Sequence, residues 1–123
     1  IDSFENVYYH GLVPRKDILK KMCESKVFVG PSRNEAFGQV YLEALMSGCN
    51  VIGSENTGAA EILKDVRNGY LVQKENLEDL KMLLIKSSDG YDLASNIAEW
   101  KKVESKYSRE CWCLDMSRLI LSL

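Results

Sequence analysis

The sequence predicts an α/β fold in which a parallel sheet is flanked by helices, a Rossmann-like arrangement. Short apolar or β-branched runs alternate along the chain with segments whose apolar residues recur at helical spacing. No repeat and no Pro/Gly/Ser-rich linker divides the 123 residues, which are enough for one core. We therefore expect a single domain over residues 1–123, with its sheet covered on both faces.

Four short runs have the composition of strands. They cover residues 7–10, 27–30, 51–53 and 70–72. Pro31 ends the second run, because proline has no amide N–H to donate within a sheet. The turn dipeptide Asn68-Gly69 leads into the fourth run. Each run is followed by a segment with helical periodicity.

Six segments have the periodicity of helices. They cover residues 15–24, about 38–47, 59–64, from 77 onward, 93–100 and from about 108 to the end. Gly48 suits the C-terminal end of the second segment. Asn76, with Asp79 three residues later, resembles a capping box at the start of the fourth. The inner face of that fourth helix is expected to hold Leu77, Leu80 and Leu84.

Composition excludes several functional classes. The 16 basic and 18 acidic residues give a formal net charge of −2, so we expect no nucleic-acid partner. No apolar stretch approaches the roughly 20 residues that cross a bilayer, and the first residues do not resemble a signal peptide. We therefore expect a cytoplasmic chain. The four cysteines and one histidine lack the spacing of zinc ligands, so no metal is expected.

The loop after the second expected strand is the candidate site, because ligands of parallel α/β sheets bind beyond the carboxyl ends of the strands. Gly38 opens a helix there, and the first-turn amides of Gly38, Gln39 and Val40 favour a phosphate. Glu43, farther along the helix, suits a neutral diol such as a ribose. Glu35, before the helix, would face whatever the phosphate carries. On spacing alone, two such acids are more often a solvated side chain and a helix-dipole partner.

The surrounding pattern adds specificity. It reads Pro31-Ser32-x-x-Glu35-x-Phe37-Gly38-x4-Glu43-Ala44-Leu45-x2-Gly48-x2-Val51-Ile52. This pattern resembles the signature of glycosyltransferase family 4, whose members are retaining enzymes of the GT-B fold, with two Rossmann-like domains across a cleft. Further similar segments are His10-Gly11-Leu12-Val13, Thr57-Gly58-Ala59-Ala60-Glu61-Ile62 and Asn68-Gly69-Tyr70-Leu71-Val72. The resemblance covers about residues 5–75.

The resemblance implies that the chain is the C-terminal, nucleotide-sugar-binding part of such an enzyme, without the acceptor domain and the first strands of the donor domain. It assigns a role to each motif position. Glu35 is the catalytic residue and lies with Ala36 and Phe37 at the transferred sugar, Gly38, Gln39 and Val40 bind the distal phosphate, Glu43 binds the ribose, and Gly11, Leu12 and Val13 line the base pocket. Packing under the first helix is an equally good interpretation of Leu12 and Val13. The family usually needs no metal or other cofactor, and a UDP-sugar is favoured over GDP- or ADP-sugars.

Three departures from the family pattern stand out. Asn50 replaces a usual proline and Thr57 replaces the first of two glycines, changes that should affect rigidity more than chemistry. The Arg and Lys that clamp the diphosphate belong to a segment that is missing from these 123 residues, so the chain alone is expected to be inactive. Arg15, Lys16 and Arg33 are basic, but no motif places them in that role, and we interpret them as surface charge.

The resemblance also implies the wider setting. A hexose or N-acetylhexosamine would pass to a saccharide or lipid-linked saccharide acceptor held by the missing domain, in surface polysaccharide or lipopolysaccharide (O-antigen) synthesis. The complete protein would be cytoplasmic or peripheral at the inner face of the membrane. Two other hypotheses stay open: a nucleotide-binding module without transferase activity, and a structural half-domain. An unpaired sheet edge could also join two copies as a homodimer.

Overall fold

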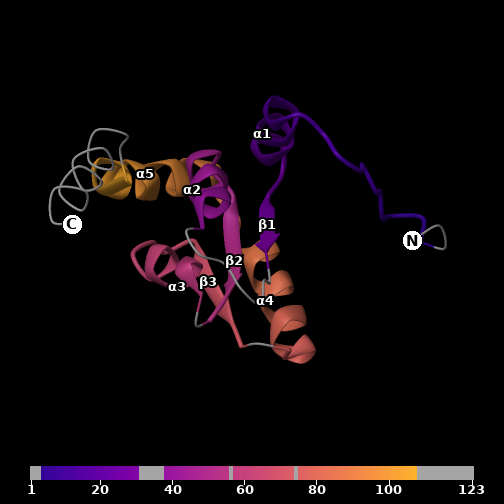
Figure 1. Cartoon of the computed structure of the whole chain (residues 1–123). Coiled ribbons are helices and arrows are strands. Elements are labelled where there is room, and N and C mark those ends of the chain that lie inside the picture. The colour runs from indigo at the N-terminus through magenta and orange to yellow at the C-terminus, as the bar shows by residue number, and fades with distance from the viewer. Residues whose placement is uncertain (1–3, 31–37, 56, 74, 108–123) are drawn as a thin grey trace, which may run out of the picture.

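A three-stranded parallel sheet lies between helices in the computed structural model, which describes residues 4–30, 38–55, 57–73 and 75–107 (Figure 1). The strands are β1 (Val27–Gly30), β2 (Asn50–Ser54) and β3 (Gly69–Val72), in the order β1-β2-β3. All five residues of β2 are buried, because this strand has a neighbour on each side and helices above and below. The predicted α/β fold is confirmed.

Helices cover both faces of the sheet. They are α1 (Arg15–Glu24), α2 (Gln39–Met46), α3 (Gly58–Leu63), α4 (Leu77–Asp89) and α5 (Leu93–Val103), followed by the 3-10 turn η1 (Glu104–Tyr107). Helices α2 and α3 pack on one face, with α1 and α5 beside α2, while α4 contacts all three strands from the other face (Figure 1). No helix in this described part of the chain is long and apolar enough to cross a membrane.

A tyrosine and two glycines fix how α2 lies on the sheet. Gly30 and Gly53 are register partners on β1 and β2, and the buried ring of Tyr41 lies against both. A Cβ atom at Gly30 would come within 2.8 Å of the Tyr41 hydroxyl oxygen, and one at Gly53 within 3.2 Å of Tyr41 Cε1. The Tyr41 hydroxyl also donates a hydrogen bond to the Gly30 carbonyl. Helix α2 therefore sits closer to the sheet than larger residues on the strands would permit.

The expected start and end signals of the helices are largely confirmed. Asn76 Oδ1 accepts a hydrogen bond from the Asp79 amide at 3.0 Å. The Asp79 carboxylate accepts a hydrogen bond from the Gln73 amide at 3.3 Å. In a full capping box it would accept from the backbone amide of Asn76 instead. Gly48 follows α2 with a φ of 88°, in the left-handed region that glycine favours.

Two expectations about local structure are wrong. Residues 7–10 form no strand, since they pair with no described strand, and Tyr8 and Tyr9 are 76% and 79% exposed. The inner face of α4 is rotated from the predicted one: Leu77 is 74% exposed, and Leu83 and Ser87 face inward with Leu80. The helix expected from residue 108 lies outside the described residues.

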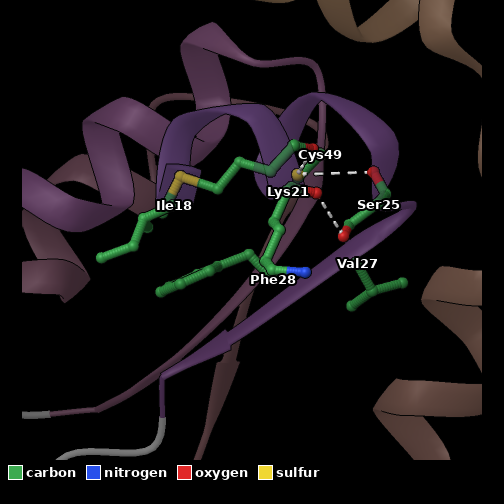
Figure 2. Close-up of a pocket in the computed structure, with 7 residues that line it drawn as sticks. Ile18, Lys21, Ser25, Val27, Phe28 and Cys49 are labelled. Carbon is green, nitrogen blue, oxygen red and sulfur yellow. Dashed lines mark hydrogen bonds between the residues drawn. The ribbon is translucent and has the colours of Figure 1, made fainter. Parts of the chain in front are cut away.

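The thiol of Cys49 joins the end of α1 to the start of β2 (Figure 2). Cys49 is buried, and its Sγ donates to the Met22 carbonyl at 3.1 Å and the Ser25 carbonyl at 3.5 Å. The thiol borders a cavity of about 190 Å³ between α1 and β1, whose lining includes Phe28. Burial, and then the nearby Cys23, raises the pKa of Cys49 from 9.0 to about 11.

Replacing Gly53 by alanine tests the close packing of α2 and α3 on the sheet. The new Cβ would lie 2.9 Å from Leu63 Cδ1 and 3.1 Å from Ala59 Cβ. We expect Gly53→Ala to lower the free energy of unfolding by about 1–3 kcal/mol, the usual cost of overpacking. Urea titration followed by circular dichroism measures this cost. Ser88→Ala, on the exposed side of α4, is the control and should change it by less than about 0.5 kcal/mol.

The environment of Cys49 predicts unequal thiol reactivity. At pH 8 iodoacetamide should modify exposed Cys23 well before Cys49, because Cys49 is buried and its raised pKa leaves little thiolate. Peptide mass spectrometry after timed labelling measures both rates. In urea the difference should vanish. Equal rates in the native protein would contradict the buried position of Cys49.

The same shift predicts a pH dependence of stability. The pKa of Cys49 is higher in the folded chain, so folding favours the protonated thiol. The contribution of the Cys49 thiol to the free energy of unfolding is fully present below pH 9 and is lost as the pH rises toward 11. Cys49→Ala should therefore flatten the decline in melting temperature across this range, relative to the unsubstituted chain.

Candidate functional site

The amino end of α2 lies at the carboxyl end of β1, where ligands of parallel sheets bind. Tyr41, in the first turn of α2, donates its hydroxyl to the carbonyl of Gly30, the last residue of β1. Its ring also meets Phe28 edge-on, with ring centroids 5.7 Å apart. The predicted helix is therefore held where the candidate site requires it. Glu35, Ala36 and Phe37, the predicted sugar-facing residues, lie outside the described residues.

Gly38 has the conformation that the predicted phosphate site needs. Its φ of 63° and ψ of 27° are left-handed, and its carbonyl accepts from the Tyr41 amide at 2.9 Å. A Cβ atom here would lie 3.1 Å from Tyr41 Cδ2 and 3.2 Å from Ile62 Cδ1. Gln39 and Val40 follow as the first two helical residues, whose amides have no acceptor within the helix. Phosphate binding by these amides stays a prediction.

Glu43, the predicted ribose ligand, meets a cation. Its carboxylate Oε1 accepts a hydrogen bond from Arg15 Nη2, at the first residue of α1. The Glu43 side chain is 16% exposed and that of Arg15 is 69% exposed. Arg15 is exposed, as expected of surface charge, and it also pairs with Glu43. Nothing in the charge pattern links residues 28 positions apart, so only the packing of α1 on α2 reveals the pair.

The predicted base-binding loop stands apart from α2. Leu12 is fully exposed, and a Cβ atom at Gly11 would meet nothing within 4 Å. Val13 is half-buried. Leu12 therefore does not pack under the first helix, which was the structural interpretation of this residue, and neither Gly11 nor Leu12 is brought against Glu43 or Gly38. Two residues after Val13, Arg15 contacts Glu43 from the first position of α1.

Both substitutions in the family pattern have a structural explanation. Thr57 has a φ of −123°, which any residue adopts, and its hydroxyl donates to the Ser54 carbonyl at 2.7 Å. The backbone N–H of Asn50 donates a hydrogen bond to the Lys26 carbonyl at 2.9 Å, a bond that proline could not make. Its side chain donates to the Ser87 carbonyl at 2.5 Å and accepts from Asn96 at 2.8 Å.

A cluster of buried amides at the amino ends of the strands was not foreseen. Asn96 also donates to the Gly48 carbonyl at 2.9 Å, and Asn68 donates to the Cys49 carbonyl at 2.8 Å. Asn68 Oδ1 is buried and has no hydrogen-bond partner among the described residues. Asn50, Asn68 and Asn96 line a polar cavity of about 320 Å³. It lies at the opposite end of the strands from α2's first turn, so the cluster supports the fold rather than the candidate site.

Metal ligands are not gathered in the described part of the chain: no three His, Cys, Asp or Glu side chains there could hold an ion together. The candidate site is thus made of helix-start amides, one carboxylate and one guanidinium. These groups can bind a phosphate and hydroxyl groups.

Comparison with known proteins relates this arrangement to a family. A sucrose synthase from Thermosynechococcus vestitus is 30% identical over 99 residues, which are 76% of this chain and 12% of the relative. An uncharacterized glycosyltransferase from Methanocaldococcus jannaschii is 31% identical over 109 residues, 85% of this chain and 31% of the relative. A poly(glycerol-phosphate) alpha-glucosyltransferase from Bacillus subtilis is 27% identical over 121 residues, 94% of this chain and 18% of the relative.

The chain therefore spans less than a third of the length of these relatives. No solved structure matches it. The model of the family described as glycosyl transferases group 1 matches residues 4–103, which include every described element from α1 to α5. This match covers the start of α2 after β1 and Glu43 on α2. The chain therefore belongs to the glycosyl transferases group 1 family.

Proposed function

We propose that the chain is the nucleotide-sugar-binding part of a retaining family 4 glycosyltransferase of the GT-B fold. One observation carries the proposal: α2 begins at a left-handed Gly38, at the carboxyl end of β1, and presents Glu43 about one and a half turns into the helix. The family match supports the transfer of a sugar. The donor is a nucleoside-diphosphate sugar, with UDP favoured over GDP and ADP.

The helix start supplies the chemistry for the diphosphate. The amides of Gly38, Gln39 and Val40, together with the helix dipole, stabilise negative charge on the distal phosphate, which also stabilises the leaving group. No metal or other cofactor is required in this scheme. Glu43 accepts hydrogen bonds from the ribose, and Gly11, Leu12 and Val13 border the base. A carboxylate is unsuited to the phosphate itself, because like charges repel.

The transferred sugar lies beyond the phosphate in this scheme. Glu35 is the catalytic residue that faces it, with Ala36 and Phe37 beside it. The sugar, a hexose or N-acetylhexosamine, passes to a hydroxyl of a saccharide or lipid-linked saccharide held by another domain. The chain alone would then bind the donor without transferring its sugar.

We further propose a role in surface polysaccharide or lipopolysaccharide synthesis, including O-antigen. The similarity to a poly(glycerol-phosphate) alpha-glucosyltransferase supports a polymeric acceptor. This setting places the protein in the cytoplasm or peripherally at the inner face of the membrane. The alternatives are a nucleotide-binding module without transferase activity and a structural half-domain that pairs with a second copy through an open edge of the sheet.

Nucleotide titration of the chain tests the ribose role of Glu43. UDP should bind more tightly than GDP or ADP in isothermal titration calorimetry. Glu43→Gln should weaken UDP binding about tenfold or more, because a hydrogen bond to a charged group contributes about 1.5–3 kcal/mol. Glu78→Gln, an exposed acid in the first turn of α4, is the control and should leave affinity unchanged. Failure of any nucleotide to bind at millimolar concentration would contradict the proposed function.

The phosphate role of the helix start has a separate test. UDP carries the distal phosphate that UMP lacks. The dissociation constant of UMP divided by that of UDP therefore measures the contribution of this phosphate. Gly38→Ala should reduce this ratio about tenfold, because a Cβ atom would crowd Tyr41 and Ile62 and force the left-handed residue to move. An equal loss of affinity for UDP and UMP would show that the substitution acts on the fold as a whole, contrary to the phosphate role.

A further inference from the structure

Arg15 holds a position that the stability of its own helix does not explain. It is the first residue of α1, where the helix dipole is positive and a cation is unfavourable by about 0.3–1 kcal/mol. Asp17, in the same turn, is the side chain that suits this dipole. The partner of Arg15 is Glu43, 28 residues away on α2. The contact therefore belongs to the junction of the two helices.

The pair also contributes little to the stability of the fold. The Arg15 side chain is 69% exposed, and ion pairs in such positions contribute about 0–1 kcal/mol. Apolar contacts already join α1 to the core, since Met22 is buried in it and Leu19 packs against it. The pair can act instead on the orientation of the Glu43 carboxylate, whose side chain is 16% exposed.

Orientation matters because a glutamate side chain has several rotatable bonds. In the described part of the chain, Oε1 of Glu43 receives the Arg15 hydrogen bond and Oε2 receives none. A carboxylate fixed through one oxygen presents the other in a defined direction, and each oxygen has lone pairs for more than one donor. A group fixed before the ligand arrives loses less conformational freedom on binding.

We propose that Arg15 is a positioning residue for the ribose: it holds the Glu43 carboxylate in the orientation that accepts the ribose hydroxyls of the donor nucleotide. This inference rests on the proposed function and adds to the family motif a residue from outside it. Arg15 itself need not contact the nucleotide. Its expected effect is therefore confined to the part of the affinity that comes from the ribose hydroxyls.

Two ligands isolate that part. UDP carries both ribose hydroxyls and 2′,3′-dideoxy-UDP carries neither, so the ratio of their dissociation constants reports the ribose contact alone. For the 123-residue chain we expect UDP to bind about tenfold more tightly. Arg15→Met should reduce this preference at least threefold, and Arg15→Lys should restore part of it. Lys16→Met removes the neighbouring exposed cation and should leave the preference unchanged.

A double substitution completes the test. In the Glu43→Gln background, Arg15→Met should change the preference no further, because the arginine acts through the carboxylate. An equal loss of affinity for both ligands would overturn the proposal, since Arg15 would then act on the phosphates, the base or the fold. A stronger preference in Arg15→Met would also overturn it, because Arg15 would then compete with the ribose.

The outcomes separate this proposal from the proposed function. If the unsubstituted chain binds UDP with the expected preference and Arg15→Met retains it, only the positioning role is wrong. If UDP and dideoxy-UDP bind the unsubstituted chain equally, the ribose role of Glu43 fails and the positioning role fails with it, while donor binding stands. If UDP does not bind at all, the proposed function itself is contradicted.

Discussion

The contact of the Tyr41 ring with two paired glycines governs the arrangement of the candidate site. Gly30 and Gly53 face each other across β1 and β2 and leave a flat area on the sheet, which the ring of Tyr41 covers. The same ring meets Phe28, and its hydroxyl reaches the last carbonyl of β1. Because Tyr41 lies in the first turn of α2, this contact places the start of the helix, Gly38 and Glu43 together. One side chain thus links the packing of α2 on the sheet to the position of the proposed donor site.

Most elements could be predicted because their patterns are local. Helix α1, strand β1 and the start of α2 follow from apolar spacing, Pro31 and Gly38, all within a few residues. Residues 7–10 have the composition of a strand, yet a strand exists only where another strand supplies hydrogen-bond partners, and the described chain supplies none. Composition indicates the propensity of a segment and does not indicate its neighbours.

The candidate site divides in the same way. Gly38 could be predicted from the need for a residue without a Cβ atom at the helix start, and its left-handed backbone agrees. The Arg15–Glu43 pair and the amide cluster of Asn50, Asn68 and Asn96 could not, because each joins residues far apart in the chain. Asn50 stands where the family pattern usually has a proline, and its hydrogen bonds explain this departure.

Helix α1 is attached at both of its ends. Arg15 at its start joins Glu43, and the carbonyls of Met22 and Ser25 at its end accept from the Cys49 thiol beside β2. A helix of ten residues is about 15 Å long. Helix α1 therefore connects the edge of the proposed donor site with the amino end of β2 across this distance. A substitution that shifts α1 at its Cys49 end would therefore also alter the contact between Arg15 and Glu43 at its other end.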